Sequence, residues 1–264
     1  MKIEEIKKLG LRTRFIDSKV VSRIQTFVEE GFQYIDLSGI EANLKEASIN
    51  NLLKSFNREN LFISDTISSN FLHIEDIFNS NLDKLGYYDC FFISKVRNMS
   101  SYEEHIASKF LIEQKKNKKV NYVGIVYEGK PNLLNTLLSS YPDIDLVALD
   151  INYLDYLNNR ESIRENINLC KNFNKKIIAL NTYKNEVLLA ISPEIEDIFR
   201  DYDPYSSPRS WAMKFVKSIP EVSLIISDFI SKKELYDDII TIKYKNDEIN
   251  ADELKCFEKV LELM

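Results

Sequence analysis

The chain has 264 residues, a formal net charge of −6 and a sequence pI near 5.2. Its hydrophobic fraction of 44% is typical of a globular protein, and its acidic balance argues against broad binding to nucleic acids or anionic membranes. No apolar run approaches the roughly 20 residues that span a bilayer, and the first residues lack the apolar block of a secretion signal. The three cysteines are odd in number and far apart, which is not typical of a disulfide framework. We therefore expect a soluble, cytoplasmic protein.

Short runs of near-continuous apolar residues recur along the chain, as in parallel strands that are covered on both faces. Seven of these runs are clear, and a weaker one precedes them. The eight predicted strands are Leu9–Thr13, Tyr34–Ser38, Leu61–Ser64, Cys90–Ser94, Tyr122–Val126, Asp145–Leu149, Lys176–Leu180 and Val222–Ile226.

Amphipathic segments lie between these runs, for example Val20–Val28, whose apolar residues have helical spacing. Ser207 followed by Pro208 predicts a helix start. The stretch 184–206 is long for a loop and contains a helical piece at 195–200; such loops grip substrates at the carboxyl ends of barrel strands.

Strand–helix repetition over this length favours a (β/α)8 barrel of the α/β class, with an open doubly wound sheet as the alternative. A capped amphipathic helix over 250–263 is added after the last repeat. No linker or composition break divides the sequence, which predicts a single domain over residues 1–264.

Five segments, taken in order, share a likeness to one known family. They are Gly31–Asp36, Asn60–Thr66, Leu85–Ser94, Ser207–Ile226 and Ser231–Asp238. Together these segments resemble the aldo/keto reductases. The most specific is Ser207–Ile226, which resembles the helix and strand that precede the phosphate-binding loop of that family. The resemblance implies a reductase-type barrel that usually binds NADPH and reduces carbonyls by hydride transfer.

Carbonyl reduction in that family uses a Tyr proton donor, a Lys that lowers the Tyr pKa, an Asp that holds the Lys, and a His that orients the substrate. Asp36 matches the Asp by position. Glu41 stands at the Tyr position, Thr66 at the Lys position and Ser94 at the His position. The resemblance therefore implies that most of the catalytic groups are missing.

Positions that contact the cofactor in the family also differ. Arg12 replaces a glycine beside the nicotinamide, and Asp228 replaces a glycine beside the phosphates. At about 4 Å, like unit charges repel by roughly 1 to 4 kcal/mol. We expect no bound cofactor, or NADPH if the family role is retained. The former cofactor cleft is expected to be lined by Arg12, Val126, Tyr127, Asp150, Leu180 and Asp228.

The acidic residues near the strand ends allow more than one interpretation. Asp36, Glu41, Asp65 and Asp150 can form a carboxylate-rich mouth that binds a divalent cation or performs acid/base chemistry. Such a cluster is more often a solvated rim, and Asp36 can simply pair with Arg12; no metal site is predicted.

Other polar residues have plainer interpretations. Tyr127, Tyr153 and Tyr183 can line a cavity or pack in the core, and His73 and His105 are expected on outer helices.

Three functions follow from these patterns. The first is a barrel without redox activity that serves as a binding scaffold or as the partner of a protein or peptide, in a biosynthetic or peptide-modifying pathway. The second is a non-redox enzyme whose acid/base groups are Asp36, Glu41 and Asp150, with Arg12 holding an anion. The third is an NAD(P)H oxidoreductase with Tyr34 or Tyr127 as proton donor. A partner protein should expose an apolar patch, an altered enzyme should enclose perturbed carboxylates, and a reductase must bind NADPH.

Overall fold

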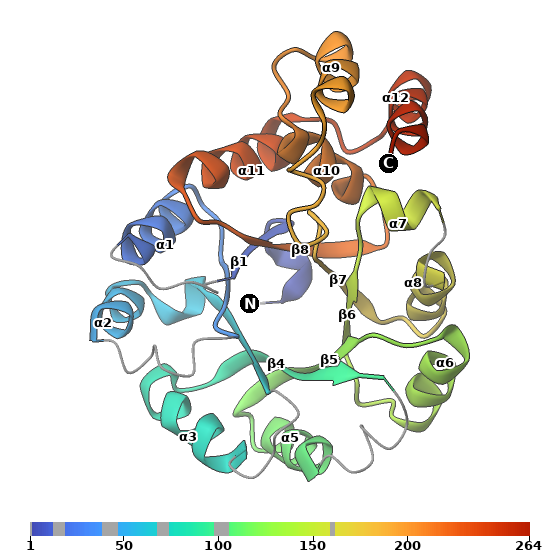
Figure 1. Ribbon diagram of the computed structural model, residues 1–264. Coiled ribbons are helices and arrows are strands. Elements are labelled where there is room, and N and C mark those ends of the chain that lie inside the picture. Colours follow the sequence, from blue (N-terminus) through green and yellow to red (C-terminus); the bar gives the residue numbers. More distant parts are fainter. Residues whose placement is uncertain (1, 13–18, 39–46, 68–73, 98–105, 159–161) are drawn as a thin grey trace.

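The computed structural model describes residues 2–12, 19–38, 47–67, 74–97, 106–158 and 162–264. Eight parallel strands close into a barrel in the order β1 to β8, and helices surround it (Figure 1). The closed ring confirms the (β/α)8 prediction and excludes the open sheet. The strands are β1 (Leu9–Arg12), β2 (Tyr34–Asp36), β3 (Phe62–Ile67), β4 (Tyr88–Val96), β5 (Val120–Tyr127), β6 (Leu146–Asp150), β7 (Lys176–Leu180) and β8 (Val222–Asp228).

The helices follow the strands in sequence and form the outer layer (Figure 1). Two short 3-10 helices, η1 (Ile3–Glu5) and η2 (Arg58–Asn60), accompany them. The α-helices are α1 (Val20–Glu29), α2 (Ala47–Ser55), α3 (Ile74–Leu85), α5 (Ile106–Lys116), α6 (Pro131–Ser140), α7 (Tyr153–Leu157), α8 (Ile163–Asn172), α9 (Pro193–Tyr202), α10 (Pro208–Lys217), α11 (Lys232–Tyr244) and α12 (Ala251–Glu262).

Side-chain caps set the ends of the last helices. Ser207 accepts a hydrogen bond from the backbone N–H of Ser210 at 3.0 Å, and Pro208 occupies the first turn of α10, as predicted. The added carboxyl-terminal helix is also confirmed, because Asn250 caps α12 through the N–H groups of Asp252 and Glu253. The helical piece predicted at 195–200 is the centre of α9, which begins after its cap, Ser192.

Two apolar layers hold the barrel. The larger one lies between the strands and the outer helices. The smaller one fills the barrel interior, where the rings of Tyr34 and Phe62 stack with centroids 5.2 Å apart. Ile3 and Ile6, which precede β1, join this inner cluster at the amino ends of the strands. The opposite end, where the parallel strands finish, is therefore the end available for a site.

Three further observations bear on the predictions. β5 continues to Tyr127, one residue beyond the predicted strand. The three cysteines, Cys90, Cys170 and Cys256, are buried free thiols. Among the described residues, no helix combines the length and the apolar composition needed to cross a bilayer.

The barrel interior depends on a close approach at Gly124. A Cβ added there would lie 2.3 Å from Cε1 of Phe92, closer than any ordinary contact. Gly124→Ala should therefore lower the free energy of unfolding by about 1–3 kcal/mol, measured by urea denaturation. The loss should shrink when the same change is made in a Phe92→Leu background, since leucine removes the ring that the new methyl would strike. An equal loss in both backgrounds would contradict this explanation.

Candidate functional site

The carboxyl ends of the strands surround a cavity of about 470 Å³. Its walls are mostly polar, and nearly every strand contributes to them. The strand residues that line it are Arg12 of β1, Thr66 of β3, Ser94 of β4, Val126 of β5, Asp150 of β6, Leu180 of β7, and Ile226 and Asp228 of β8. This cavity is called the mouth below.

Strand alternation explains which side chains reach the mouth. Along β8, Leu224 and Ile226 belong to the inner cluster, while Ile225 packs against the outer helices. Asp228 continues the inward series and lines the mouth. The same alternation along β6 takes Leu146 to the inner cluster and Asp150 to the mouth. β6 and β8 are thus apolar where they are buried and end in a carboxylate where they open into the mouth.

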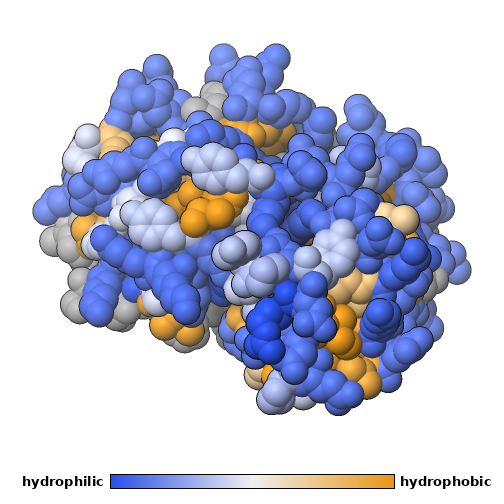
Figure 2. Space-filling model, turned by 90° about the horizontal axis from the view of Figure 1, so that it is seen from above, coloured by the Kyte–Doolittle hydropathy of each residue, from blue (hydrophilic) through white to orange (hydrophobic). Residues whose placement is uncertain are grey.

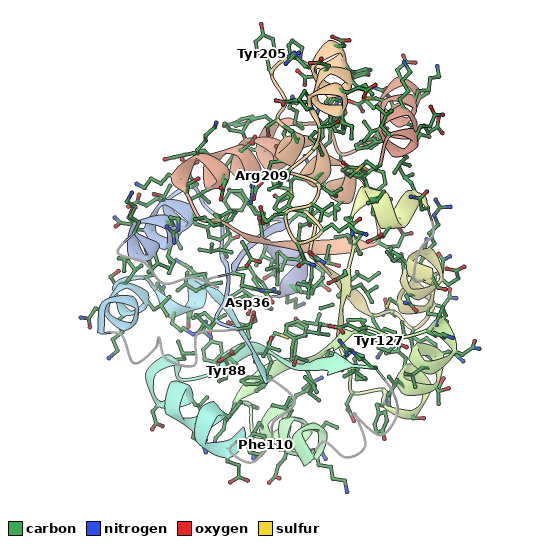
Figure 3. The ribbon with its side chains drawn as sticks, in the orientation of Figure 1. Asp36, Tyr88, Phe110, Tyr127, Tyr205 and Arg209 are labelled. Carbon is green, nitrogen blue, oxygen red and sulfur yellow. The ribbon has the colours of Figure 1, made fainter. Side chains whose placement is uncertain are left out.

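A buried ion pair forms the floor of the mouth on the side of β1 and β2. Arg12 Nε lies 3.0 Å from Asp36 Oδ2, and the two side chains are 15% and 3% exposed. Ser38 fixes the same carboxylate, since its N–H donates to Oδ1 and its hydroxyl donates to Oδ2, each at 2.9 Å. Asp36 lies near the centre of the ring of strands in Figure 3.

Arg12 keeps its positive charge in the folded protein. Burial disfavours the charged guanidinium, but the attraction of Asp36 and Asp228 outweighs burial and raises the pKa of Arg12. The floor of the mouth therefore carries a permanent positive charge between two carboxylates.

Asp150 faces this floor from β6. It accepts a hydrogen bond from Asn181 Nδ2 at 2.8 Å. Although the carboxyl group is open to the mouth, the surrounding walls exclude much of its water, and this desolvation raises the pKa of Asp150 despite the bond from Asn181. On the rim, Arg97 Nη2 lies 2.6 Å from Glu128 Oε2.

The segment after β7 forms another wall of the mouth. Asn181, Lys184, Asn185 and Glu186 all have positive φ, between 49° and 69°. This conformation is costly outside glycine and persists only where other contacts hold it. The contacts are present: the N–H of Asn185 donates to Asn181 Oδ1 at 2.7 Å, and Lys184 pairs with Asp155 of α7.

A buried polar cluster anchors the same wall from behind. Arg209 of α10 makes two bonds of 2.9 Å to the carboxylate of Asp238 in α11 and a third, also 2.9 Å, to Ser227 Oγ of β8. The hydroxyl of Tyr183 donates to Asp238 Oδ1 at 2.6 Å, and the guanidinium lies 4.0 Å from the centroid of the Tyr183 ring. Arg209 lies among α10, β8 and α11 in Figure 3. Nothing in the sequence pattern identified this cluster, because its members come from distant segments.

The structure brings together most of the side chains expected in the former cofactor cleft. Arg12, Val126, Asp150, Leu180 and Asp228 line the mouth, together with Thr66 and Ser94. Whether these residues bind a ligand stays a prediction.

The expected position of Tyr127 is wrong. Because β5 extends through this residue, alternation turns its ring outward into the layer beneath the helices, where its hydroxyl donates to Lys130 O at 2.6 Å. It lines a second cavity behind β5, of about 1250 Å³, together with residues of α6 and α8.

Other candidates lie apart from the mouth or outside the described residues. Asp65 is buried and does not line the mouth. In the sequence of β3 it lies between two residues whose side chains point inward. Tyr153 packs against Phe257 in the core. Glu41, His73 and His105 fall outside the described residues. Within the described ranges, no group of three His, Cys, Asp or Glu side chains is arranged to hold a metal ion.

Comparison with solved structures gives consistent fold matches. A thermostable aldo-keto reductase in complex with the inhibitor epalrestat matches with a TM-score of 0.77 and 18% identity, over 97% of this chain and 95% of that one. A holo-form aldo-keto reductase from Bacillus halodurans gives a TM-score of 0.72 and 16% identity, covering 97% and 92% of the two chains. One from Klebsiella pneumoniae in complex with NADPH gives 0.75 and 11%, covering 97% and 91%. The chain has the aldo-keto reductase fold.

Sequence comparison adds nothing to this result. No protein-family model matches the chain, and no curated protein matches it. The structural likeness at these low identities establishes the barrel and its topology alone.

The hydrogen bond from Asn181 should set the ionisation of Asp150. Asn181→Gly tolerates the positive φ and removes the amide donor, so the pKa of Asp150 should rise further above its ordinary value. A carboxyl-carbon NMR titration would measure this shift. Since the folded-state pKa is already raised, the contribution of Asp150 to stability is present at low pH and lost as pH rises through that pKa.

Asn185→Gly is the matched control for this titration. Asn185 also lines the mouth with a positive φ, but the Asn181 side chain that contacts Asp150 is unchanged in this variant. Equal pKa shifts in the two variants would show that loop conformation, and not the hydrogen bond, sets the ionisation of Asp150.

Proposed function

We propose that this protein is an aldo/keto-reductase-type barrel that has lost NADPH-dependent carbonyl reduction. It would bind a small polar ligand in the mouth and act as a binding scaffold or partner protein in a biosynthetic or peptide-modifying pathway. The observation that carries the proposal is the Arg12–Asp36 ion pair on the floor of the mouth. The carboxylate that would hold a catalytic lysine in the family holds an arginine from β1 instead.

The mouth lacks the tyrosine–lysine proton donor of carbonyl reduction among its described residues. Arg12 keeps its proton, because its pKa is raised above an already high value. Tyr183 is the one tyrosine among the described lining residues, and its hydroxyl is bound to buried Asp238. Thr66 and Ser94 lie at the strand ends where the family resemblance places Lys and His, and neither hydroxyl replaces those groups at neutral pH.

The fold family implies NADPH, and the residues after β8 do not fit its phosphates. The amino end of α11, where backbone N–H groups attract anions, is already occupied by the chain's own carboxylate. Glu234 accepts from the N–H of Ile230 at 2.7 Å, and the Ser231 hydroxyl accepts from the N–H of Glu234 at 3.2 Å. Asp228 adds a second negative charge at the end of β8. A phosphate here would meet two carboxylates in place of open backbone donors.

What the mouth offers is a set of fixed, opposite charges. Arg12 and Arg97 supply donors, while Asp150, Asp228 and Glu128 supply acceptors. Asn181, Thr182 and Asn185 add neutral hydrogen-bonding groups on the wall after β7. Such a lining suits a small, hydrophilic molecule that carries both an anionic group and hydrogen-bond donors.

A non-redox acid/base enzyme is the second candidate, and Asp150 is the observation that favours it. A carboxyl group with a raised pKa can retain a proton closer to neutral pH and donate it to a bound ligand. Asp36 and Glu41 complete this hypothesis. Once a ligand is identified, Asp150→Asn should abolish its turnover while sparing its binding if this candidate is correct. If the mouth only binds, neither the parent nor the variant should convert the ligand.

The third hypothesis, an oxidoreductase with another tyrosine as donor, has little support. Tyr34 is fully buried beneath the mouth, and burial raises its pKa well above the ordinary value. Tyr127 faces away from the mouth, and burial raises its pKa to about 12. Neither hydroxyl is placed to protonate a substrate in the mouth.

NADPH titration tests the proposal directly, with nucleotide fluorescence and thermal unfolding followed together. We expect no binding at millimolar NADPH. Binding tighter than about 10 μM would stabilise the fold by ~2.7 kcal/mol at a nucleotide concentration of 100 times Kd, and would overturn the proposal. The Klebsiella pneumoniae reductase, solved with NADPH, is the positive control. If repulsion excludes the phosphates, the double variant Asp228→Asn/Glu234→Gln should bind NADPH more tightly than the parent.

A further inference from the structure

Helix α11 carries apolar residues on two opposite faces. Leu235 and Ile239 are buried against the barrel, as a surface helix requires. Tyr236, Ile240 and Tyr244 lie on the outer face at four-residue spacing, and Ile240 and Tyr244 are 49% and 75% exposed. A helix that is apolar on both faces is ordinarily covered on both.

The segment between α9 and α10 extends this outer surface. Asp203 pairs with Lys245 at 2.7 Å just past the end of α11, and Ser207 bonds to Asp237 in its middle, so residues 203–207 lie along the helix. Tyr205, at the centre of the segment, is 94% exposed and projects from the molecule (Figure 3). Tyr205, Tyr236, Ile240 and Tyr244 are called the α11 patch below.

The α11 patch lies on the side of the molecule that carries α9, α11 and α12, which is the upper side of Figure 1. Figure 2 shows hydrophobic surface there, bordered by pale aromatic rings and surrounded by hydrophilic residues. Exposed apolar surface with tyrosines, enclosed by charge, is typical of a protein–protein interface.

The residues around the α11 patch are self-complementary. Tyr236 and Tyr244 stand four residues on either side of Ile240. Exposed Lys232 and Lys233 lie at the beginning of the helix. Exposed Glu248 lies just after its end, beside Asp247, whose carboxylate pairs with Lys217 at 2.8 Å. A two-fold axis at Ile240 would bring Ile240 onto its own copy, each Tyr236 opposite a Tyr244, and each basic end opposite an acidic end.

We propose that the α11 patch binds a second copy of this chain, with the two α11 helices antiparallel about a two-fold axis at Ile240. The occupant is a second copy because one surface supplies both members of every apolar and charged pair, which is what an isologous interface requires. A foreign partner would need to reproduce the same reversal of charge along its own length.

The geometry of this dimer leaves the mouth open. α11 begins after β8, at the mouth, and runs back toward the amino ends of the strands. Antiparallel pairing therefore points the two mouths in opposite directions. The proposed dimer consequently does not depend on the proposed function. An experiment that disproves ligand binding leaves the dimer untouched, and the reverse also holds.

Sedimentation equilibrium of the full chain tests the dimer. We expect a monomer–dimer equilibrium for the parent, and a monomer for Ile240→Asp with unchanged circular dichroism. Leu254→Asp is the matched control, since Leu254 is an exposed leucine of α12 outside the patch, and this variant should dimerise like the parent. A monomeric parent at about 100 μM, where a specific protein pair of micromolar Kd would associate, overturns the proposal. So does a dimer that survives Ile240→Asp.

Charge reversal tests the antiparallel arrangement. Lys232→Glu and Glu248→Lys should each raise the dimer Kd about tenfold, because a two-fold axis at Ile240 places position 232 opposite position 248 and each change puts like charges across it. The double variant should recover most of the parent affinity, as both reversed charges meet again in the symmetric pair. Failure of the double variant to recover, with both singles weakened, rules out the antiparallel register.

Cross-linking tests the position of the axis. The native thiols are buried, so Ile240→Cys introduces a reactive group at the proposed axis. Mild oxidation should convert this variant to a disulfide-linked dimer, whereas Glu258→Cys on α12 should remain uncross-linked. Equal cross-linking of the two variants would contradict the assigned interface.

Discussion

The buried arginine at the end of β1 is the interaction on which the mouth depends. A guanidinium in this position needs carboxylates nearby, because removing a charge from water is costly unless it is paired. Asp36 and Asp228, on the strands that flank β1 in the barrel, supply them. The carboxylates of Asp36 and Asp228 therefore neutralise the charge of Arg12. A reductase of the family that the sequence resembles would use the same region to position a lysine, a tyrosine and a nicotinamide, and the proposed loss of carbonyl reduction rests on this contrast.

The walls around that floor are fixed by contacts made behind them. Residues with left-handed backbone conformations after β7 keep their positions because Asn181, Lys184 and Tyr183 each reach a partner on another element. Arg209 ties α10, β8 and α11 to the same wall through Asp238 and Ser227. A binding site benefits from such preorganisation, since little ordering remains to be done when a ligand enters. The polar cluster therefore supports the wall of the mouth from behind, and Tyr183 is the member that also lines the cavity.

The sequence predicted the architecture well and the polar contacts poorly. Near-continuous apolar runs identified the strands, because each is covered on both faces, and β1 was the weakest since its four residues include glycine and arginine. Tyr127 was misplaced because β5 continues through it, and alternation places its side chain on the opposite side of the sheet from its inward neighbour Val126. The Arg209–Asp238 pair was missed since periodicity carries no information about which distant charges meet.

The exposed face of α11 follows from the same rules that build the barrel. Every outer helix must bury one apolar face against the strands, and for α11 Leu235 and Ile239 meet that requirement. Tyr236, Ile240 and Tyr244 are therefore not needed to bury the inner face of α11, and their exposure favours association with another surface. The mouth is formed by strand ends and the α11 patch by the outer face of a helix. The two surfaces therefore use different residues, and one can change without altering the other. The two proposals are therefore compatible: the barrel can keep a polar site at one end while its side is free to associate.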